Sequence, residues 1–250
     1  MRKIVAIPMA AAAVLVGEVL HMAHRRDLPS LENQDPSGVF GDPNLPELCV
    51  VALGDSSITA PGVEPLDACW IRRVAHDLSR DYHVTLHSVA VGGSKAADVL
   101  ETQLESALAL APDIAIVSVG ANDALRATPV ARFERDLDVI VDRLARATRF
   151  GVAITGVGDL GTIPRLPSVP RAYARVRSRS FDRATRRVAA SYPNTAKAIT
   201  WGPTWVSFEF DPDMFAGDLF HASADGHAIF GTHMIPVIRT LLSQHGVTGS

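Results

Sequence analysis

Short apolar runs alternate with longer amphipathic segments along most of the chain. Runs typical of strands that are covered on both faces occur at about 48–53, 82–91, 114–119, 152–157 and 196–201. Between them, apolar residues recur every three to four positions. This spacing predicts helices at about 68–80 and 96–110, from Pro129 past Leu144, at about 171–190, and at about 224–242.

Strands that alternate with helices predict an α/β protein with a mostly parallel sheet and helices on both faces. Right-handed crossovers leave few topologies for such a sheet. We expect a three-layer α/β/α, flavodoxin-like arrangement of about five strands, formed by a single domain over residues 48–245.

The first 26 residues differ from this pattern. Arg2 and Lys3 precede an apolar run from Ile4 to Val16, which is typical of an export signal and short for a membrane-spanning helix of about 20 apolar residues. No small-x-small cleavage site follows the run. A signal peptide and an uncleaved membrane anchor therefore both fit residues 1–26, and a buried N-terminal core helix is a third interpretation. The first two predict a domain outside the cytoplasm, secreted or membrane-anchored.

Residues 27–47 are polar and contain four prolines, which predicts a linker between the N-terminal segment and the domain. The composition of the whole chain, 47% hydrophobic and 20% charged, allows a sizeable core. A net charge of -3 gives no reason to expect a nucleic-acid partner. The two cysteines, Cys49 and Cys69, have no zinc-ligand spacing, and whether they pair is left open. We predict no metal and no cofactor.

Small and polar residues follow three of the predicted strands and precede the last helix. These segments are Gly54-Asp55-Ser56, Gly92-Gly93-Ser94, Gly120-Ala121-Asn122-Asp123 and Asp218-Leu219-Phe220-His221. The carboxyl ends of parallel strands meet at one edge of a sheet, where ligands bind. A serine that cleaves an ester needs a base, a group that orients the base, and donors for the oxyanion. The chain offers a candidate for each.

The same four segments, in this order, resemble the blocks of the SGNH (GDSL-type) hydrolases over about residues 49–242. The resemblance implies Ser56 as the nucleophile, His221 as the general base and acid, and Asp218 as the carboxylate that orients it. It also implies an oxyanion hole formed by the backbone N–H groups of Ser56 and Gly93 and the side chain of Asn122. Ser57 departs from the family, which usually has leucine there, and this leaves the shape of the acyl pocket open.

The function that follows is hydrolysis of a carboxylic ester, as by an esterase or lipase, through an acyl-enzyme on Ser56. Two alternatives stay open: an acyltransferase that uses the same triad on envelope sugars or lipids, and a non-catalytic envelope-binding domain. Small molecules, lipids and polysaccharides all qualify as the ester substrate.

Two further features concern the surroundings of this site. Five arginines recur at every fourth position of the predicted helix at 171–190, namely Arg171, Arg175, Arg179, Arg183 and Arg187. They form either a solvated helix face or a surface for an anionic envelope layer. Residues 158–170 fit a lid over the serine. Trp205, Phe208, Phe210 and Phe215 fit either an acyl pocket or packing at the sheet edge.

Overall fold

The computed structural model of the protein describes residues 17, 25 and 27–246. Apart from residues 17 and 25, the N-terminal segment 1–26 and its interpretation as an export signal, anchor or core helix lie outside these residues. No helix within the described ranges is long and apolar enough to cross a membrane.

A single sheet of six strands forms the centre of the molecule, in the order β1-β3-β2-β4-β5-β6. The strands are β1 (Gly38–Phe40), β2 (Glu47–Gly54), β3 (His83–Ser88), β4 (Ile114–Ser118), β5 (Gly151–Ile154) and β6 (Thr195–Lys197). All neighbouring strands are parallel except β1, which pairs antiparallel with β3. The α/β class and the mostly parallel sheet predicted from the sequence are confirmed.

The central strand β2 explains why its sequence is apolar on both sides. Val50 pairs with Leu86 of β3 and with Ile114 of β4. Val50 and Ala52 pack into one core, and Val51 and Leu53 pack into the other. A strand that is buried on both faces needs apolar residues at successive positions.

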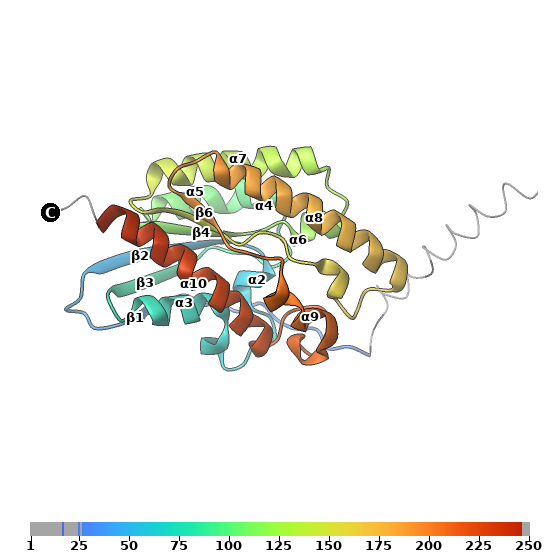
Figure 1. The fold of residues 1–250 in the computed structure, drawn as a ribbon. Coiled ribbons are helices and arrows are strands. Elements are labelled where there is room, and N and C mark those ends of the chain that lie inside the picture. Colours follow the sequence, from blue (N-terminus) through green and yellow to red (C-terminus); the bar gives the residue numbers. More distant parts are fainter. Residues whose placement is uncertain (1–16, 18–24, 26, 247–250) are drawn as a thin grey trace, which may run out of the picture.

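Two layers of helices cover the sheet (Figure 1). One core joins the sheet to α3 (Trp70–Leu78) and α10 (Ala224–Gly246), and the other joins it to the layer that contains α7 (Val130–Ala147) and α8 (Ser168–Ala190). Short elements complete the fold: α2 (Ser56–Thr59), η1 (Leu66–Ala68), α4 (Ala96–Asp98), η2 (Val99–Gln103), α5 (Leu104–Ala109), α6 (Ala121–Leu125), η3 (Leu160–Thr162), η4 (Pro203–Trp205), α9 (Ser207–Phe210) and η5 (Pro212–Met214).

The proline-rich segment 27–47 differs from the linker that its sequence predicts. It supplies β1, the sixth strand at the edge of the sheet. The backbone N–H of Gln34 donates to Thr59 at 2.8 Å, and its side chain donates to the carbonyls of Ala60 at 2.7 Å and Val63 at 3.0 Å. These bonds fix the segment on the domain, which therefore begins well before residue 48.

The two cysteines do not pair, because they lie on opposite faces of the sheet. Cys69 is buried in the core with α3 and α10, whereas Cys49 packs against the core on the other face. Burial raises the pKa of the Cys69 thiol. Both residues are free thiols that serve packing.

Candidate active site

The serine is positioned by an abrupt end of β2. Gly54 has a φ of +148°, and a Cβ at this position would lie 1.9 Å from the carbonyl oxygen of Ser118. Glycine therefore lets β2 and β4 approach closely where the chain turns off the sheet. The next residue, Asp55, accepts a hydrogen bond from the backbone N–H of Ser57 at 3.0 Å and caps α2. Ser56 is thereby placed in the first turn of a short helix at the carboxyl edge of the sheet.

The histidine and its carboxylate are held in a tight turn before α10. Oδ1 of Asp218 accepts the backbone N–H groups of Phe220 and His221, both at 3.0 Å, and Oδ2 accepts a hydrogen bond from Nδ1 of His221 at 2.7 Å. Leu219 has a φ of +59°, which the turn requires. The backbone N–H of Ala216 donates to the carbonyl of His221 at 2.8 Å and closes the turn. This geometry leaves Nε2 of His221 to face a reaction partner.

The ionisation of Asp218 suits this role. Burial by itself raises the pKa of its carboxyl group, but the hydrogen bonds from the side chain and backbone of His221 and from the backbone of Phe220 outweigh burial and hold the pKa below its usual value. Asp218 is therefore a carboxylate at neutral pH. A carboxylate on Nδ1 fixes the tautomer of the histidine and stabilises its protonated form.

The loops after β3 and β4 bring in the two remaining residues. Gly93 has a φ of +81°, and a Cβ there would meet only Arg126, at 3.5 Å. The side-chain amide of Asn122, on α6, donates to the carbonyl of Ser94 at 3.2 Å and to Asp55 at 3.4 Å. Its neighbour Asp123 accepts the backbone N–H of Ala96 at 2.9 Å, which ties α6 to α4.

All four segments meet in one cleft of about 750 Å³, which we call the serine cleft. Ser56, Gly93, Asn122 and His221 all line it. Gly92 also lines the cleft, but a Cβ at Gly92 would lie 2.0 Å from the side chain of Asn33, whereas Gly93 is open. No hydrogen bond within residues 27–246 joins the hydroxyl of Ser56 to His221, an open arrangement that is common in catalytic sites before substrate binds.

A buried glutamine supports the site and is absent from the sequence prediction. Oε1 of Gln103 accepts the backbone N–H of Gly54 at 2.8 Å, and its Nε2 donates to the carbonyl of Gly54 at 2.9 Å and to the hydroxyl of Ser94 at 3.1 Å. Gln103 is 1% exposed. A polar side chain at an apolar position of an amphipathic segment is a signal that could have identified it.

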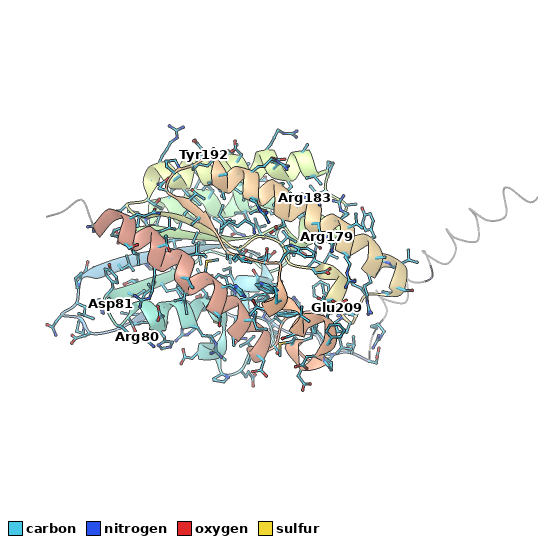
Figure 2. The ribbon with its side chains drawn as sticks, in the orientation of Figure 1. Arg80, Asp81, Arg179, Arg183, Tyr192 and Glu209 are labelled. Carbon is cyan, nitrogen blue, oxygen red and sulfur yellow. The ribbon has the colours of Figure 1, made fainter. Side chains whose placement is uncertain are left out.

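The five arginines at every fourth position do not all project freely from α8. Arg175 forms ion pairs with Asp159 at 2.9 Å and Glu209 at 3.3 Å, and Arg187 pairs with Glu134 at 2.6 Å. Arg171 donates to the carbonyl of Pro164 at 3.0 Å. Figure 2 shows Arg179 and Arg183 further along the same helix. Neither of these two has a carboxylate partner among the residues that the structure describes.

The comparisons with known proteins agree with this geometry. The model of the family described as GDSL-like Lipase/Acylhydrolase matches residues 52–229. The chain belongs to this family. The predicted resemblance to SGNH (GDSL-type) hydrolases is thereby confirmed. None of the curated proteins compared with the chain matches it.

Several solved structures, two of them named as esterases, share the fold of this family member. The structure named TesA has a TM-score of 0.63 at 22% identity, and the match covers 77% of this chain and 99% of TesA. The psychrotrophic esterase EstA from Pseudoalteromonas sp. has a TM-score of 0.61 at 17% identity, over 78% and 98% of the two chains. Axe2, an acetylxylan esterase from Geobacillus stearothermophilus, has a TM-score of 0.59 at 17% identity, over 80% and 95%. At these identities the likeness concerns the fold.

Proposed function

We propose that the protein hydrolyses carboxylic esters through an acyl-enzyme on Ser56. The observation that carries this proposal is the serine cleft, where Ser56, Gly93 and Asn122 lie with a histidine that an ionised Asp218 orients. Membership of a family of lipases and acylhydrolases supports the same chemistry.

In the first half of the reaction, Nε2 of His221 takes the proton from the hydroxyl of Ser56. The serine oxygen then forms a bond to the carbonyl carbon, and the carbonyl oxygen becomes an oxyanion. The bond from that carbon to the alcohol oxygen breaks, and His221 returns its proton to the leaving alcohol. In the second half, water loses a proton to His221, and its oxygen forms a bond to the acyl carbon. The bond from that carbon to the oxygen of Ser56 then breaks, the acid leaves, and His221 returns the proton to Ser56.

The oxyanion would be held by the backbone N–H groups of Ser56 and Gly93 and by the side-chain amide of Asn122. The hydrogen bond from the side-chain amide of Asn122 to Asp55 is long, at 3.4 Å. The N–H of Asn122 would therefore leave Asp55 and donate to the oxyanion instead. Losing one such donor costs about 3–4 kcal/mol of barrier lowering.

Replacing the serine tests the proposal. We expect Ser56→Ala to lower kcat for p-nitrophenyl acetate by about 10⁶-fold, the size of loss that follows removal of a serine nucleophile. A fluorophosphonate probe should add to Ser56 in the wild type, as seen by peptide mass spectrometry. Ser57→Ala is the matched control, because Ser57 is adjacent but does not line the serine cleft, and it should keep the adduct. Equal rates for wild type and Ser56→Ala would refute the assignment.

The alternative of acyl transfer is tested in the same assay. Adding glycerol or a monosaccharide as an acceptor should leave the free acid as the main product if water is the natural acceptor. An ester of the added alcohol as the main product would favour a transferase.

A further inference from the structure

A second cavity lies behind the serine cleft. It has a volume of about 180 Å³ and is lined by six tryptophan and phenylalanine side chains, so we call it the aromatic cavity. The six are Trp70, Trp205, Phe208, Phe215, Phe220 and Phe230. Trp205 stacks on Phe208 with ring centroids 5.8 Å apart, and Phe208 stacks on Phe230 at 5.6 Å. These aromatics therefore form one continuous wall, and they are not merely packed at the sheet edge.

The two cavities lie on either side of the same three segments. Ser56, Asn122 and His221 line the serine cleft. Their chain neighbours Ser57, Ala121 and Phe220 line the aromatic cavity. Adjacent residues of the chain therefore face different cavities at Ser56, at Asn122 and at His221, and a single residue separates the two cavities at each place.

Among the residues that the structure describes, Phe220 alone lines both cavities. Its ring contacts the ring of His221 edge-on, with centroids 5.1 Å apart. The side chain is only partly buried, so it has space on the side of the cleft. A rotation of this ring would join the two spaces.

The chemistry of the aromatic cavity points to an uncharged, apolar occupant. Within the described part of the chain, no lysine or arginine lines it. Two aspartates do, but Asp159 pairs with Arg175 at 2.9 Å, and Asp55 accepts the backbone N–H of Ser57 at 3.0 Å. The hydroxyl groups of Ser57, Ser118 and Thr155 bond to one another, at 2.5 Å between Ser57 and Ser118 and at 3.0 Å between Ser118 and Thr155. Nε2 of His233 is a buried nitrogen without a partner, and one neutral nitrogen is too little to hold a charged group that has lost its water.

We propose that the aromatic cavity binds the alkyl chain of the acyl group, and that Phe220 controls entry to it. This inference rests on the ester hydrolysis proposed above. The acyl group stays bonded to Ser56 through both half-reactions, whereas the alcohol leaves after the first. A space reached past a side chain suits the part that stays, and the larger serine cleft suits the part that leaves. The preferred substrates are then esters of linear acyl groups longer than acetyl.

The test is the ratio of kcat/KM for p-nitrophenyl octanoate to that for p-nitrophenyl acetate, because a ratio cancels any general damage to the chemistry. In the wild type, kcat/KM should rise by about fourfold for each methylene that is buried, until the cavity is full. Phe220→Ala should raise the ratio at least about tenfold by removing the partition. Ile163→Phe, which extends a side chain of the cavity wall, should lower it by at least about fourfold.

Two controls make the result specific. Phe210→Ala removes the same side chain from α9, where Phe210 is 77% exposed and lines neither cavity, so its ratio should equal that of the wild type. Phe220→Leu is the second variant to use if Phe220→Ala does not fold. It keeps an apolar side chain at this position and should raise the octanoate-to-acetate ratio less than Phe220→Ala does. A second series, ethyl to octyl acetates followed by pH-stat titration, varies the alcohol instead. If Phe220→Ala and Ile163→Phe changed the chain-length dependence of kcat/KM only in this alcohol series, the assignment of the cavity to the acyl group would be overturned.

The outcomes separate this inference from the proposed function. If all esters remain intact and Ser56 takes up no fluorophosphonate, the ester hydrolysis itself is refuted. If Ser56 is labelled and esters are cleaved, but the ratio is the same in wild type, Phe220→Ala and Ile163→Phe, then only the role of the aromatic cavity is overturned.

Discussion

Two carboxyl groups close to Ser56 have opposite pKa shifts, and their hydrogen bonds explain the difference. Asp218 accepts three bonds of 2.7–3.0 Å, which outweigh its burial and lower its pKa. Asp55 is as little exposed as Asp218, at 3%, but it accepts only bonds of 3.0 Å from Ser57 and 3.4 Å from Asn122. Burial dominates there and raises the pKa of Asp55 to about 6. Only Asp218 is placed to stabilise a positive histidine.

The raised pKa of Asp55 predicts a pH-dependent cost to stability. Between the ordinary carboxyl pKa of about 4 and the folded value of about 6, the folded protein holds a proton that the unfolded chain has lost. The free energy of unfolding therefore falls as pH rises through this window. Asp55→Asn cannot ionise, so from pH 4 to pH 7 its stability relative to wild type should improve by about 3 kcal/mol, or about 1.4 kcal/mol per pKa unit.

Urea denaturation of both proteins at pH 4, 5, 6 and 7 measures this difference. Taking the difference between the two proteins removes the contribution of the other titrating groups, which they share. Parallel stability curves over the whole range would mean that Asp55 ionises as easily in the folded protein as in the unfolded chain.

At the scale of elements, the turn of π-helix η2 positions a support for the end of β2. The predicted helix at 96–110 is divided into α4, η2 and α5. A π-turn adds a residue to a helix and is often found at functional sites. Here the turn ends at Gln103, whose amide binds both backbone polar groups of Gly54 and the hydroxyl of Ser94. Gln103 therefore links the end of β2, which leads into Ser56, to the loop that contains Gly93.

Gln103→Leu should destabilise the protein strongly. The substitution leaves the buried N–H of Gly54 without a partner, whereas the carbonyl keeps its hydrogen bond from the backbone N–H of Val91 at 3.2 Å. An unpaired buried group of this kind costs about 1–3 kcal/mol. We expect a loss of about 1–3 kcal/mol in the free energy of unfolding, measured with urea at pH 7. Glu101→Leu makes a similar change on the exposed side of the same turn and should alter it by less than about 0.5 kcal/mol. A small effect of Gln103→Leu would show that Gly54 is satisfied in another way.

Elements with a strong local pattern were predictable from the sequence. Residues 114–119 and the apolar stripe from Phe133 to Leu144 gave β4 and α7 because burial on one or both faces leaves a regular apolar spacing. The three-residue strand β1 has no such pattern. Its partner β3 lies more than 40 residues away, and tertiary pairing alone makes it a strand.

The residues of the candidate site likewise fall into those that the sequence predicts and those that depend on tertiary packing. Ser56, Asn122 and His221 follow or precede regular elements, so the sequence predicts that they meet at one edge. Gln103 and Phe220 act through contacts that depend on the packing of distant segments, which local spacing does not specify. The division of the site into two cavities is a property of the folded molecule.

At the scale of the whole molecule, the mouth of the serine cleft lies beside an exposed face of α8. Val169 and Tyr173 line the cleft, and both are half exposed. Val176 follows one turn later and is 68% exposed. Arg179 and Arg183 continue the same face, at spacings of three and seven residues from Val176 (Figure 2). Apolar side chains near the cleft are thus followed by two positive charges.

This arrangement favours the interpretation of α8 as a surface that binds an anionic layer, which stays a prediction. Apolar side chains can enter the headgroup region of a lipid layer while arginines attract its phosphates. The export and anchoring predicted for residues 1–26 would bring the domain to such a layer. Binding by this face would also turn the serine cleft toward lipid esters.

Arg179→Gln combined with Arg183→Gln tests the surface. Each arginine near an anionic membrane contributes about 1 kcal/mol, so the double variant should bind phosphatidylglycerol-containing vesicles about 30-fold more weakly in co-sedimentation at low salt. The matched control is Arg80→Gln with Arg132→Gln, which removes the same charge away from α8 and should bind as the wild type does. Because all proteins keep residues 1–26, any binding by that segment cancels in the comparison. High salt should weaken the wild type to the level of the double variant, since exposed charges are screened. Equal binding by all three proteins would mean that this face of α8 is a solvated helix face.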